Sequence, residues 1–249
     1  MRESVLEVRV LGCGDAFGSG GRFQTCFLVS GPGRRFLVDC GATSVVAMHR
    51  WAVDRGGIDF VLLTHLHGDH MGGVPFFVLD SHFTVRRTRP LLVAGPPGTR
   101  TRLREVMETL FPGSPAMTLR FPLEVTEYAL ETPNRIAGLT VTPYEVVHPC
   151  GAPPTALRIE CDGRTIAYSG DTQWAQGLVR AADGTDLLLL ECNGYDRRLP
   201  HHLDLGTLLE HRDELRSRRI VLTHMGEEML AHRDRAPWEC AEDGLTLAV

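Results

Sequence analysis

The stretch Thr64-His65-Leu66-His67-Gly68-Asp69-His70 places three imidazoles and one carboxylate in a single short loop. It directly follows residues 60–63, an apolar run that is typical of a buried strand. Loops at strand ends are held by a rigid sheet and often carry catalytic groups. Histidine nitrogens and carboxylate oxygens suit a borderline-soft divalent ion, and Gly68 is expected to let the backbone turn sharply. The stretch therefore predicts a metal-binding loop at the end of a strand.

Three further candidate ligands follow predicted strands in the same way. His148 follows the strand expected at 140–147, Asp171 the strand at 164–169, and His224 the strand at 220–223. Taken singly, each of these residues would more often be structural. Four groups of ligand-type residues that recur at the same place relative to their strands indicate one shared site, which has enough ligands for one ion or for two.

The rest of the chain alternates short strands and helices. Apolar runs at 187–190 and 220–222 indicate strands covered on both faces, and Asp162-Gly163 predicts a hairpin. Pro143 predicts a sheet edge within the strand at 140–147. No linker divides the chain, so we expect one domain over residues 1–249, with two packed sheets and helices outside them. Further strands are expected at 5–11, 25–29, 35–38 and 155–161, and helices at 44–51, 101–110 and 204–216.

The composition favours an enzyme for small molecules over a protein that tracks long nucleic acid. The chain of 249 residues has 26 basic and 31 acidic side chains, a net charge of −5 without a basic stripe. Its 7 cysteines show neither zinc-ribbon spacing nor an obvious disulfide framework. Residues 1–8 have the pattern of a strand and not of a signal peptide, and no apolar run nears the roughly 20 residues that span a bilayer. We therefore expect a cytoplasmic protein without a membrane partner.

The order H-x-H-x-D-H, followed by single His, Asp and His residues, resembles the metallo-β-lactamase superfamily over essentially the whole chain. The resemblance implies an α/β (α+β) fold, the four-layer αββα sandwich. It also implies two divalent metal ions, with zinc preferred and manganese or iron as alternatives. The residues implied to hold one ion are His65, His67 and His148, and those for the other are Asp69, His70 and His224, with Asp171 bridging the two.

Within the superfamily, the chain resembles the ribonuclease Z-like branch. The segments that carry this resemblance are residues 11–18, with the sequence LGCGDAFG, residues 168–172, with YSGDT, and Leu222-Thr223-His224. The branch implies a Glu–His pair that assists departure of the alcohol, here Glu191 with His202, and His201 competes for the role of His202. Asp69 is counted among the expected catalytic residues as well as among the ligands.

An Asp after an early strand is another mark of the superfamily. Asp39 stands in this position, directly after the strand expected at 35–38. It is expected to orient the metal-binding loop through hydrogen bonds.

The resemblance implies a metal-dependent hydrolase in which a hydroxide that bridges both ions attacks the substrate. We expect a small anionic ester, and among such esters a small phosphodiester, cyclic ones included. A tRNA 3′-processing endoribonuclease is disfavoured, because no segment has the Gly/Pro-rich character of a tRNA-binding arm. A hydrolase of lactones, carboxylic esters or thioesters is an alternative, although Trp174 occupies the position at which lactonases carry Tyr. A catalytically silent binding protein is a further alternative, disfavoured because no expected ligand is missing. The branch also implies a homodimer.

Overall fold

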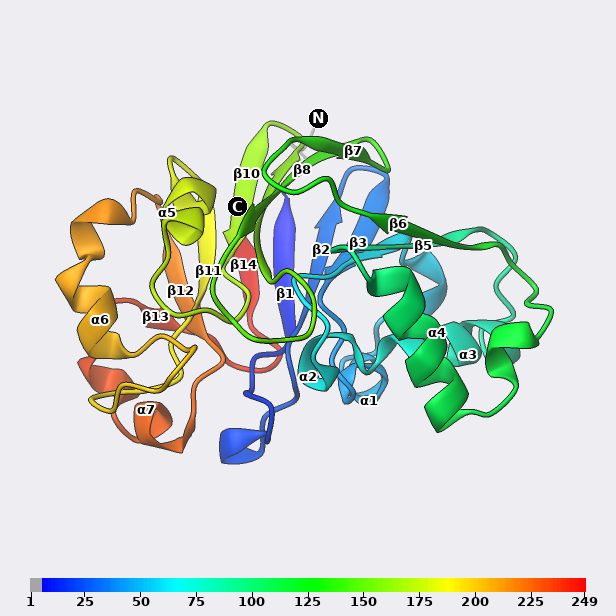
Figure 1. The fold of residues 1–249 in the computed structure, drawn as a ribbon, viewed down its shortest axis with the longest axis horizontal. Helices are drawn as coiled ribbons and strands as arrows, with labels where there is room; N and C mark the ends of the chain where they lie inside the picture. The colour runs from blue at the N-terminus through cyan, green and yellow to red at the C-terminus, as the bar shows by residue number, and fades with distance from the viewer. Residues whose placement is uncertain (1–5) are drawn as a thin grey trace.

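The computed structural model describes residues 6–249, which form two seven-stranded sheets packed face to face. A buried apolar cluster drawn from both sheets lies between them and includes Phe27, Phe36 and Tyr168. Figure 1 shows the sheets in the middle of the molecule, with helices on either side. The first residue of the strand expected at 5–11, Val5, and residues 1–4 lie outside the described range.

The first sheet contains the strand that leads into the metal-binding loop. Its β14, β1, β2 and β3 are antiparallel neighbours, and β3 to β6 run parallel to one another. Across the sheet the order is β14 (Thr246–Ala248), β1 (Glu7–Gly12), β2 (Cys26–Gly31), β3 (Arg34–Val38), β4 (Phe60–Leu62), β5 (Leu91–Gly95) and β6 (Leu123–Glu127).

The second sheet contains the strands that lead into the later candidate ligands. Its β7 to β10 are antiparallel neighbours, and β10 to β13 run parallel to one another. Across the sheet the order is β13 (Glu239–Cys240), β12 (Ile220–Thr223), β11 (Leu187–Glu191), β10 (Arg164–Tyr168), β9 (Thr155–Cys161), β8 (Leu139–Glu145) and β7 (Asn134–Ile136).

Helices cover the outer face of each sheet. Against the first sheet lie α1 (Ser44–Arg50), α2 (Gly68–Met71), α3 (Val74–Phe83) and α4 (Thr99–Leu110), and against the second lie α5 (Gln176–Ala182), α6 (Leu205–Glu210) and α7 (Glu227–Ala231). Two further apolar clusters fill the spaces between helices and sheets. The layers are therefore helix, sheet, sheet and helix, and the expected αββα sandwich is confirmed. Within residues 6–249, no helix is long and apolar enough to cross a membrane.

Several local predictions are confirmed. The apolar runs of β11 and β12 are parallel strands buried along their length. Asp162 and Gly163 both have positive φ, of 50° and 78°, as expected for a two-residue hairpin turn between β9 and β10.

Pro143 pairs with Leu157 of β9, whereas β7 faces β8 only over residues 139–141. Beyond those residues the Pro143 carbonyl accepts a hydrogen bond from the Glu131 N–H at 2.9 Å, so β8 lies inside the sheet and the expected sheet edge at Pro143 was wrong. The proline is tolerated because a single residue, and not a strand, pairs with it on the side where it lacks an N–H.

Other boundaries differ from the prediction. The helix expected at 204–216 ends after α6 at Glu210, and a separate 3₁₀ turn, Arg212–Glu214, follows it. The strand expected at 140–147 ends at Glu145, two residues before the chain reaches His148. Those two residues carry the backbone from the edge of the sheet to the candidate metal centre.

Candidate metal centre

The metal-binding loop runs from the end of β4 into the short helix α2. The backbone turns from extended at His67 into this helix at Gly68, but Gly68 has no positive φ and a Cβ there would have no atom within 4 Å, so the turn does not depend on a glycine. The close approach occurs instead at Gly41, after β3. A Cβ at Gly41 would lie 2.2 Å from the carbonyl oxygen of Asp69. A glycine at position 41 therefore lets the loop lie directly against the end of β3.

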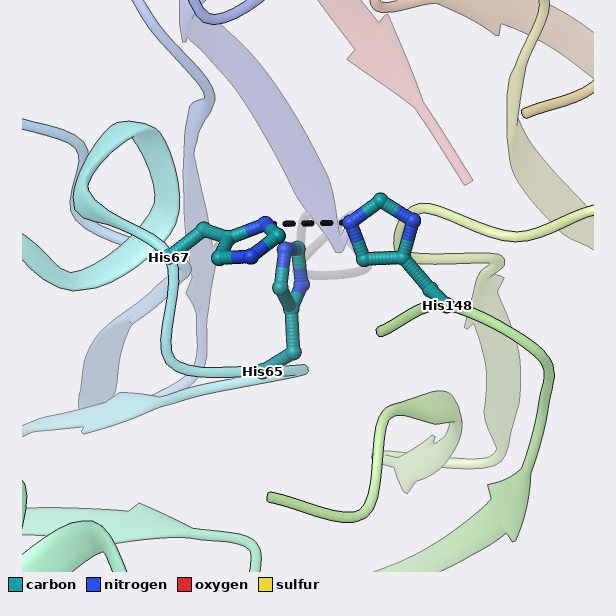
Figure 2. Close-up of side chains that lie close together, drawn as sticks. All are labelled: His65, His67 and His148. Carbon is teal, nitrogen blue, oxygen red and sulfur yellow. Dashed lines mark hydrogen bonds between the residues drawn. The ribbon is translucent and has the colours of Figure 1, made fainter. Parts of the chain in front are cut away.

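The structure brings His65, His67 and His148 together. Each offers a ring nitrogen, and these nitrogens lie within 4.8 Å of one another. Figure 2 shows the three rings converging, with Nδ1 of His67 and Nε2 of His148 3.0 Å apart. His148 comes from the second sheet and the other two from the first, so the set joins the two halves of the sandwich. Three convergent imidazoles could hold a borderline-soft divalent ion.

A second set of four residues lies beside the first. It comprises Asp69, His70, Asp171 and His224, whose ligand atoms also lie within 4.8 Å of one another. Nε2 of His224 is 3.2 Å from Oδ2 of Asp69 and 3.4 Å from Oδ2 of Asp171. Oδ2 of Asp171 also lies 3.9 Å from Nε2 of His65 and 3.8 Å from Nε2 of His148. Asp171 therefore lies between the two sets, as a bridging carboxylate must.

Asp39 supports the loop from below. Its fully buried carboxylate accepts hydrogen bonds from the Thr64 backbone N–H at 2.8 Å, from Thr64 Oγ1 at 2.7 Å and from His70 Nδ1 at 2.6 Å. Nδ1 of His65 lies 3.0 Å from the same Thr64 hydroxyl. The carboxylate thus fixes the His70 ring directly and the His65 ring through Thr64, and it leaves Nε2 of both rings facing the cluster.

The two neighbouring histidines on the loop before α6 have different positions. His202 places Nδ1 3.0 Å from Oε2 of buried Glu191, and its ring lies against that of His148, with centroids 4.9 Å apart. The His201 side chain is exposed, and its backbone carbonyl accepts a hydrogen bond from Nδ1 of His148 at 3.0 Å. The Glu191–His202 pair therefore stands in the predicted arrangement, and His201 contributes only its backbone.

Burial and charge act differently on the two sets. Burial lowers the pKa of each of His65, His67 and His148, which favours their neutral, metal-binding form. Burial also opposes protonation of His70 and His224, but nearby carboxylates, chiefly Asp171, outweigh it. The pKa of His70 is held well above its usual value and that of His224 is raised to about 9.

The same residues meet the requirements of a metal centre. Within the described chain, Nε2 of His65, Nε2 of His70 and Oδ1 of Asp171 are buried side-chain atoms without a hydrogen bond of good geometry, although Nε2 of His70 lies 3.2 Å from Oδ1 of Asp171. Buried polar atoms in native proteins are nearly always paired. Unpaired nitrogens and a carboxylate oxygen that converge on one point are explained by divalent cations, and the geometry is compatible with two of them.

A pocket of about 370 Å³ opens onto both sets. Its wall includes the predicted His67, Asp69, His148, Asp171, His202 and His224. Sequence reasoning missed the other wall residues, which are Asp15, Ala16, Phe17, Asn193, Leu199 and Pro200. Asp15, Ala16 and Phe17 lie in the opening segment that carried the branch resemblance, so that segment was the available signal. Asn193 stands two residues after Glu191, where its Nδ2 donates to the His224 carbonyl at 3.2 Å.

Comparison with known proteins agrees with this arrangement. The family described as "Anti-Pycsar protein Apyc1" matches residues 6–239. A ribonuclease Z of Mycobacterium tuberculosis (strain ATCC 25618 / H37Rv) is 30% identical over 194 residues, which cover 74% of this chain and 68% of the relative.

Among solved structures, the metallo-β-lactamase fold protein YhfI of Bacillus subtilis superposes with a TM-score of 0.79 at 19% identity, and covers 98% of this chain and 100% of its own. The short form of human tRNase Z gives a TM-score of 0.77 at 23% identity, with 98% and 99% covered. At these sequence identities, the two solved structures show that the fold is shared. The chain is therefore a ribonuclease Z-like hydrolase of the metallo-β-lactamase superfamily, and it belongs to the family described as Anti-Pycsar protein Apyc1.

Proposed function

We propose that the protein is a phosphodiesterase that uses two divalent ions, preferably zinc, to hydrolyse a small phosphodiester, cyclic ones included. The observation that carries the proposal is that members of both ligand sets line one pocket of about 370 Å³ together with His202, which buried Glu191 holds. Pockets of about 300–1,000 Å³ are typical for small molecules. The proposed ligands are those of the two sets, with Asp171 shared between them.

The charge of the loaded site favours an anionic ester. Two divalent ions would contribute four positive charges, against which Asp69 and Asp171 of the second set place two negative ones. When bound, such ions supply Lewis acidity and an activated water as the nucleophile. A phosphodiester carries the negative charge that this excess attracts, and a neutral ester does not.

His202 is the proposed proton donor to the leaving alkoxide. Its Nδ1 is engaged by Glu191, so Nε2 is the atom left to carry the transferable proton, and the ring lies on the pocket wall. Glu191 is in turn fixed by the Thr172 backbone N–H, next to Asp171. Proton transfer from a positioned imidazole typically contributes about 10²- to 10⁴-fold to the rate.

Small substrates fit the wall better than long RNA does. In the described part of the chain, no arginine lines the pocket, whose wall instead carries Asp15, Phe17 and Leu199. Proteins that hold long nucleic acid neutralise many phosphates with basic side chains. The M. tuberculosis relative is named a ribonuclease, and the nucleotides of RNA are joined by phosphodiester bonds. The bond proposed to be cleaved here is of the same type, in a smaller substrate.

The test is hydrolysis of bis(p-nitrophenyl) phosphate by metal-analysed protein, with p-nitrophenyl acetate and a chelated sample as controls. We expect chelator-sensitive turnover with about two metals per chain. His202→Ala should lower kcat by about 10²-fold or more without loss of metal. His201→Asn is the matched control, because the His201 side chain is exposed and asparagine tolerates its φ of 67°. Two bound metals without phosphodiester turnover would sink the phosphodiesterase proposal and direct the search to lactones and thioesters.

A further inference from the structure

Phe17 is an exposed aromatic residue on the wall of the catalytic pocket. The residue is 94% exposed, the highest value among the exposed large hydrophobic residues of the described chain. The same residue lines the pocket onto which His67, Asp171 and His202 open. Core packing does not explain this phenyl ring, because a ring that packed in the core would be buried and this one is exposed to water.

The loop that carries Phe17 is fixed by hydrogen bonds. Oδ1 of Asp15 accepts from the Phe17 N–H at 3.2 Å and from the Ser19 N–H at 2.9 Å, and Oδ2 accepts from the Ser19 hydroxyl at 2.7 Å. Gln24 holds the Ala16 carbonyl at 2.9 Å, and Gly18 completes the turn with a φ of 70°. The hydrogen bonds thus fix the backbone from which the exposed ring projects, which favours a preorganised contact.

The same loop is tied to the metal centre. The His224 N–H donates to the Cys13 carbonyl at 3.0 Å, and Gly14 forms a bridge to Met225. His224 is one of the residues of the second ligand set. The backbone that carries the Phe17 ring is therefore fixed relative to His224, one of the residues that would hold the metal.

We propose that Phe17 is a specificity-determining residue, whose ring stacks on a flat aromatic group esterified to the phosphorus of the substrate. Ala16, Leu199 and Pro200 supply the other apolar parts of the wall. An aromatic substituent held there loses water on one face and gains an aromatic partner, whereas an alkyl substituent gains less. This inference deepens the proposed function. It rests on that function for one point, that the substrate has a phosphorus-containing group.

The test compares phenylphosphonate with methylphosphonate. These two non-hydrolysable probes share the phosphonate group, and the phosphorus carries a phenyl ring in the first and a methyl group in the second. Calorimetry on metal-loaded wild type should show tighter binding of phenylphosphonate. Phe17→Ala should weaken phenylphosphonate by about 3- to 10-fold and leave methylphosphonate within about twofold. Phe83→Ala is the matched control, since Phe83 is 64% exposed on α3 and does not line the pocket. Phe17→Leu keeps apolar bulk without a ring and should resemble Phe17→Ala.

Three results would overturn the inference. The wild type could bind both phosphonates equally, Phe17→Ala could change both affinities in parallel, or Phe17→Leu could retain the full preference for the ring. Sedimentation velocity adds a check. A change of mass in Phe17→Ala with an unchanged phenyl preference would assign Phe17 to a contact between two copies of the chain.

Failure of the proposed function gives a different result. Binding requires no turnover, so a wild type that prefers phenylphosphonate but leaves bis(p-nitrophenyl) phosphate intact would contradict the phosphodiesterase proposal and support the role of Phe17. If turnover is present, the KM for bis(p-nitrophenyl) phosphate should rise by about 3- to 10-fold in Phe17→Ala, with kcat nearly unchanged.

Discussion

Asp39 shows how much of the centre depends on single side chains that touch no substrate. It is fully buried, and its φ of 55° lies in the left-handed region, which non-glycine residues seldom adopt. Burial raises the pKa of its carboxyl, which the charge of His70 opposes. The hydrogen bonds from Thr64 and His70 offset the cost of burying the carboxylate. They also orient a histidine of each ligand set, His70 directly and His65 through Thr64.

Asp39→Asn keeps the shape of the side chain and removes its charge. We expect metal affinity to fall by about 10- to 100-fold, because support of this kind typically has that effect. Competition with a chromophoric chelator measures the affinity. The matched control is Asp162→Asn, which lies in the β9–β10 hairpin with a similar φ of 50°. Equal metal affinities in the two variants would show that Asp39 does not position the ligands.

Glu191→Gln tests the proton donor through pH. Burial lowers the pKa of His202, but the hydrogen bond and charge of Glu191 outweigh it, and the net pKa is raised. A donor with a raised pKa stays protonated to higher pH, so its loss limits activity on the alkaline side. Removing the charge of Glu191 should move the alkaline limb of kcat to lower pH. An unmoved limb with full metal content would exclude His202 as the donor.

At the scale of elements, the site depends on short loops at the ends of strands from both sheets. The metal-binding loop follows β4, Asp39 follows β3, and the segments with Asp171 and His224 follow β10 and β12. The loop after β4 lies so close to the end of β3 that only a glycine fits at position 41. Packing between elements, as well as ligand chemistry, therefore sets the geometry.

Gly41→Ala and Gly68→Ala form a matched pair. A Cβ at Gly41 would meet the Asp69 carbonyl, so the loop must shift, and we expect loss of metal and a destabilisation of about 1–3 kcal/mol. A Cβ at Gly68 meets nothing within 4 Å in a helical backbone, so Gly68→Ala should be neutral or slightly stabilising. Metal analysis and thermal unfolding measure both effects. A reversed order would contradict the structure.

The sequence predicted some elements better than others, for physical reasons. The continuous apolar runs of β11 and β12 and the turn at Asp162-Gly163 have strong local signals, and the structure has them. In contrast, α3 was not predicted, because Val74-Pro75-Phe76-Phe77-Val78 is apolar all round and shows no helical periodicity. The ligands were predictable because their chemistry is rare, whereas Phe17 and Asn193 carry no such signal and were found only from the pocket.

At the scale of the whole molecule, the centre joins the two halves of the sandwich. His65 to His70 come from the first sheet and His148, Asp171 and His224 from the second, so loaded metal would hold the two together. That the chain forms one domain over 1–249 and that it forms a homodimer stay predictions. Sedimentation of the loaded protein measures the second.

Metal uptake should release protons and strengthen with pH. In the protein without metal, the raised pKa of His224, about 9, keeps it protonated at neutral pH, and the carboxylates around His70 raise its pKa in the same direction. A metal must displace these protons, so affinity should rise by about tenfold per pH unit for each proton released, up to about pH 9. Chelator competition at several pH values measures this slope. Affinity that is independent of pH would contradict it.

The stability of the metal-free protein should follow the opposite trend. The pKa of His224 is raised from about 6.5 unfolded to about 9 folded, so its contribution is complete below about pH 6.5 and is lost as pH rises through about 9. Denaturant unfolding with a chelator present measures the trend. The loaded protein should gain stability over the same interval, because its metals bind more tightly.

The pairing of β1 with β14 has a consequence for biosynthesis. Glu7 lies opposite Ala248, and Asp243 holds the backbone N–H groups of Cys13 and Phe23. During translation, β1 and the loop that carries Phe17 are made before β14 and Asp243, which follow more than 200 residues later. The nascent chain therefore exposes this edge of β1 until β14 has been made, and that interval is when a chaperone would be needed most.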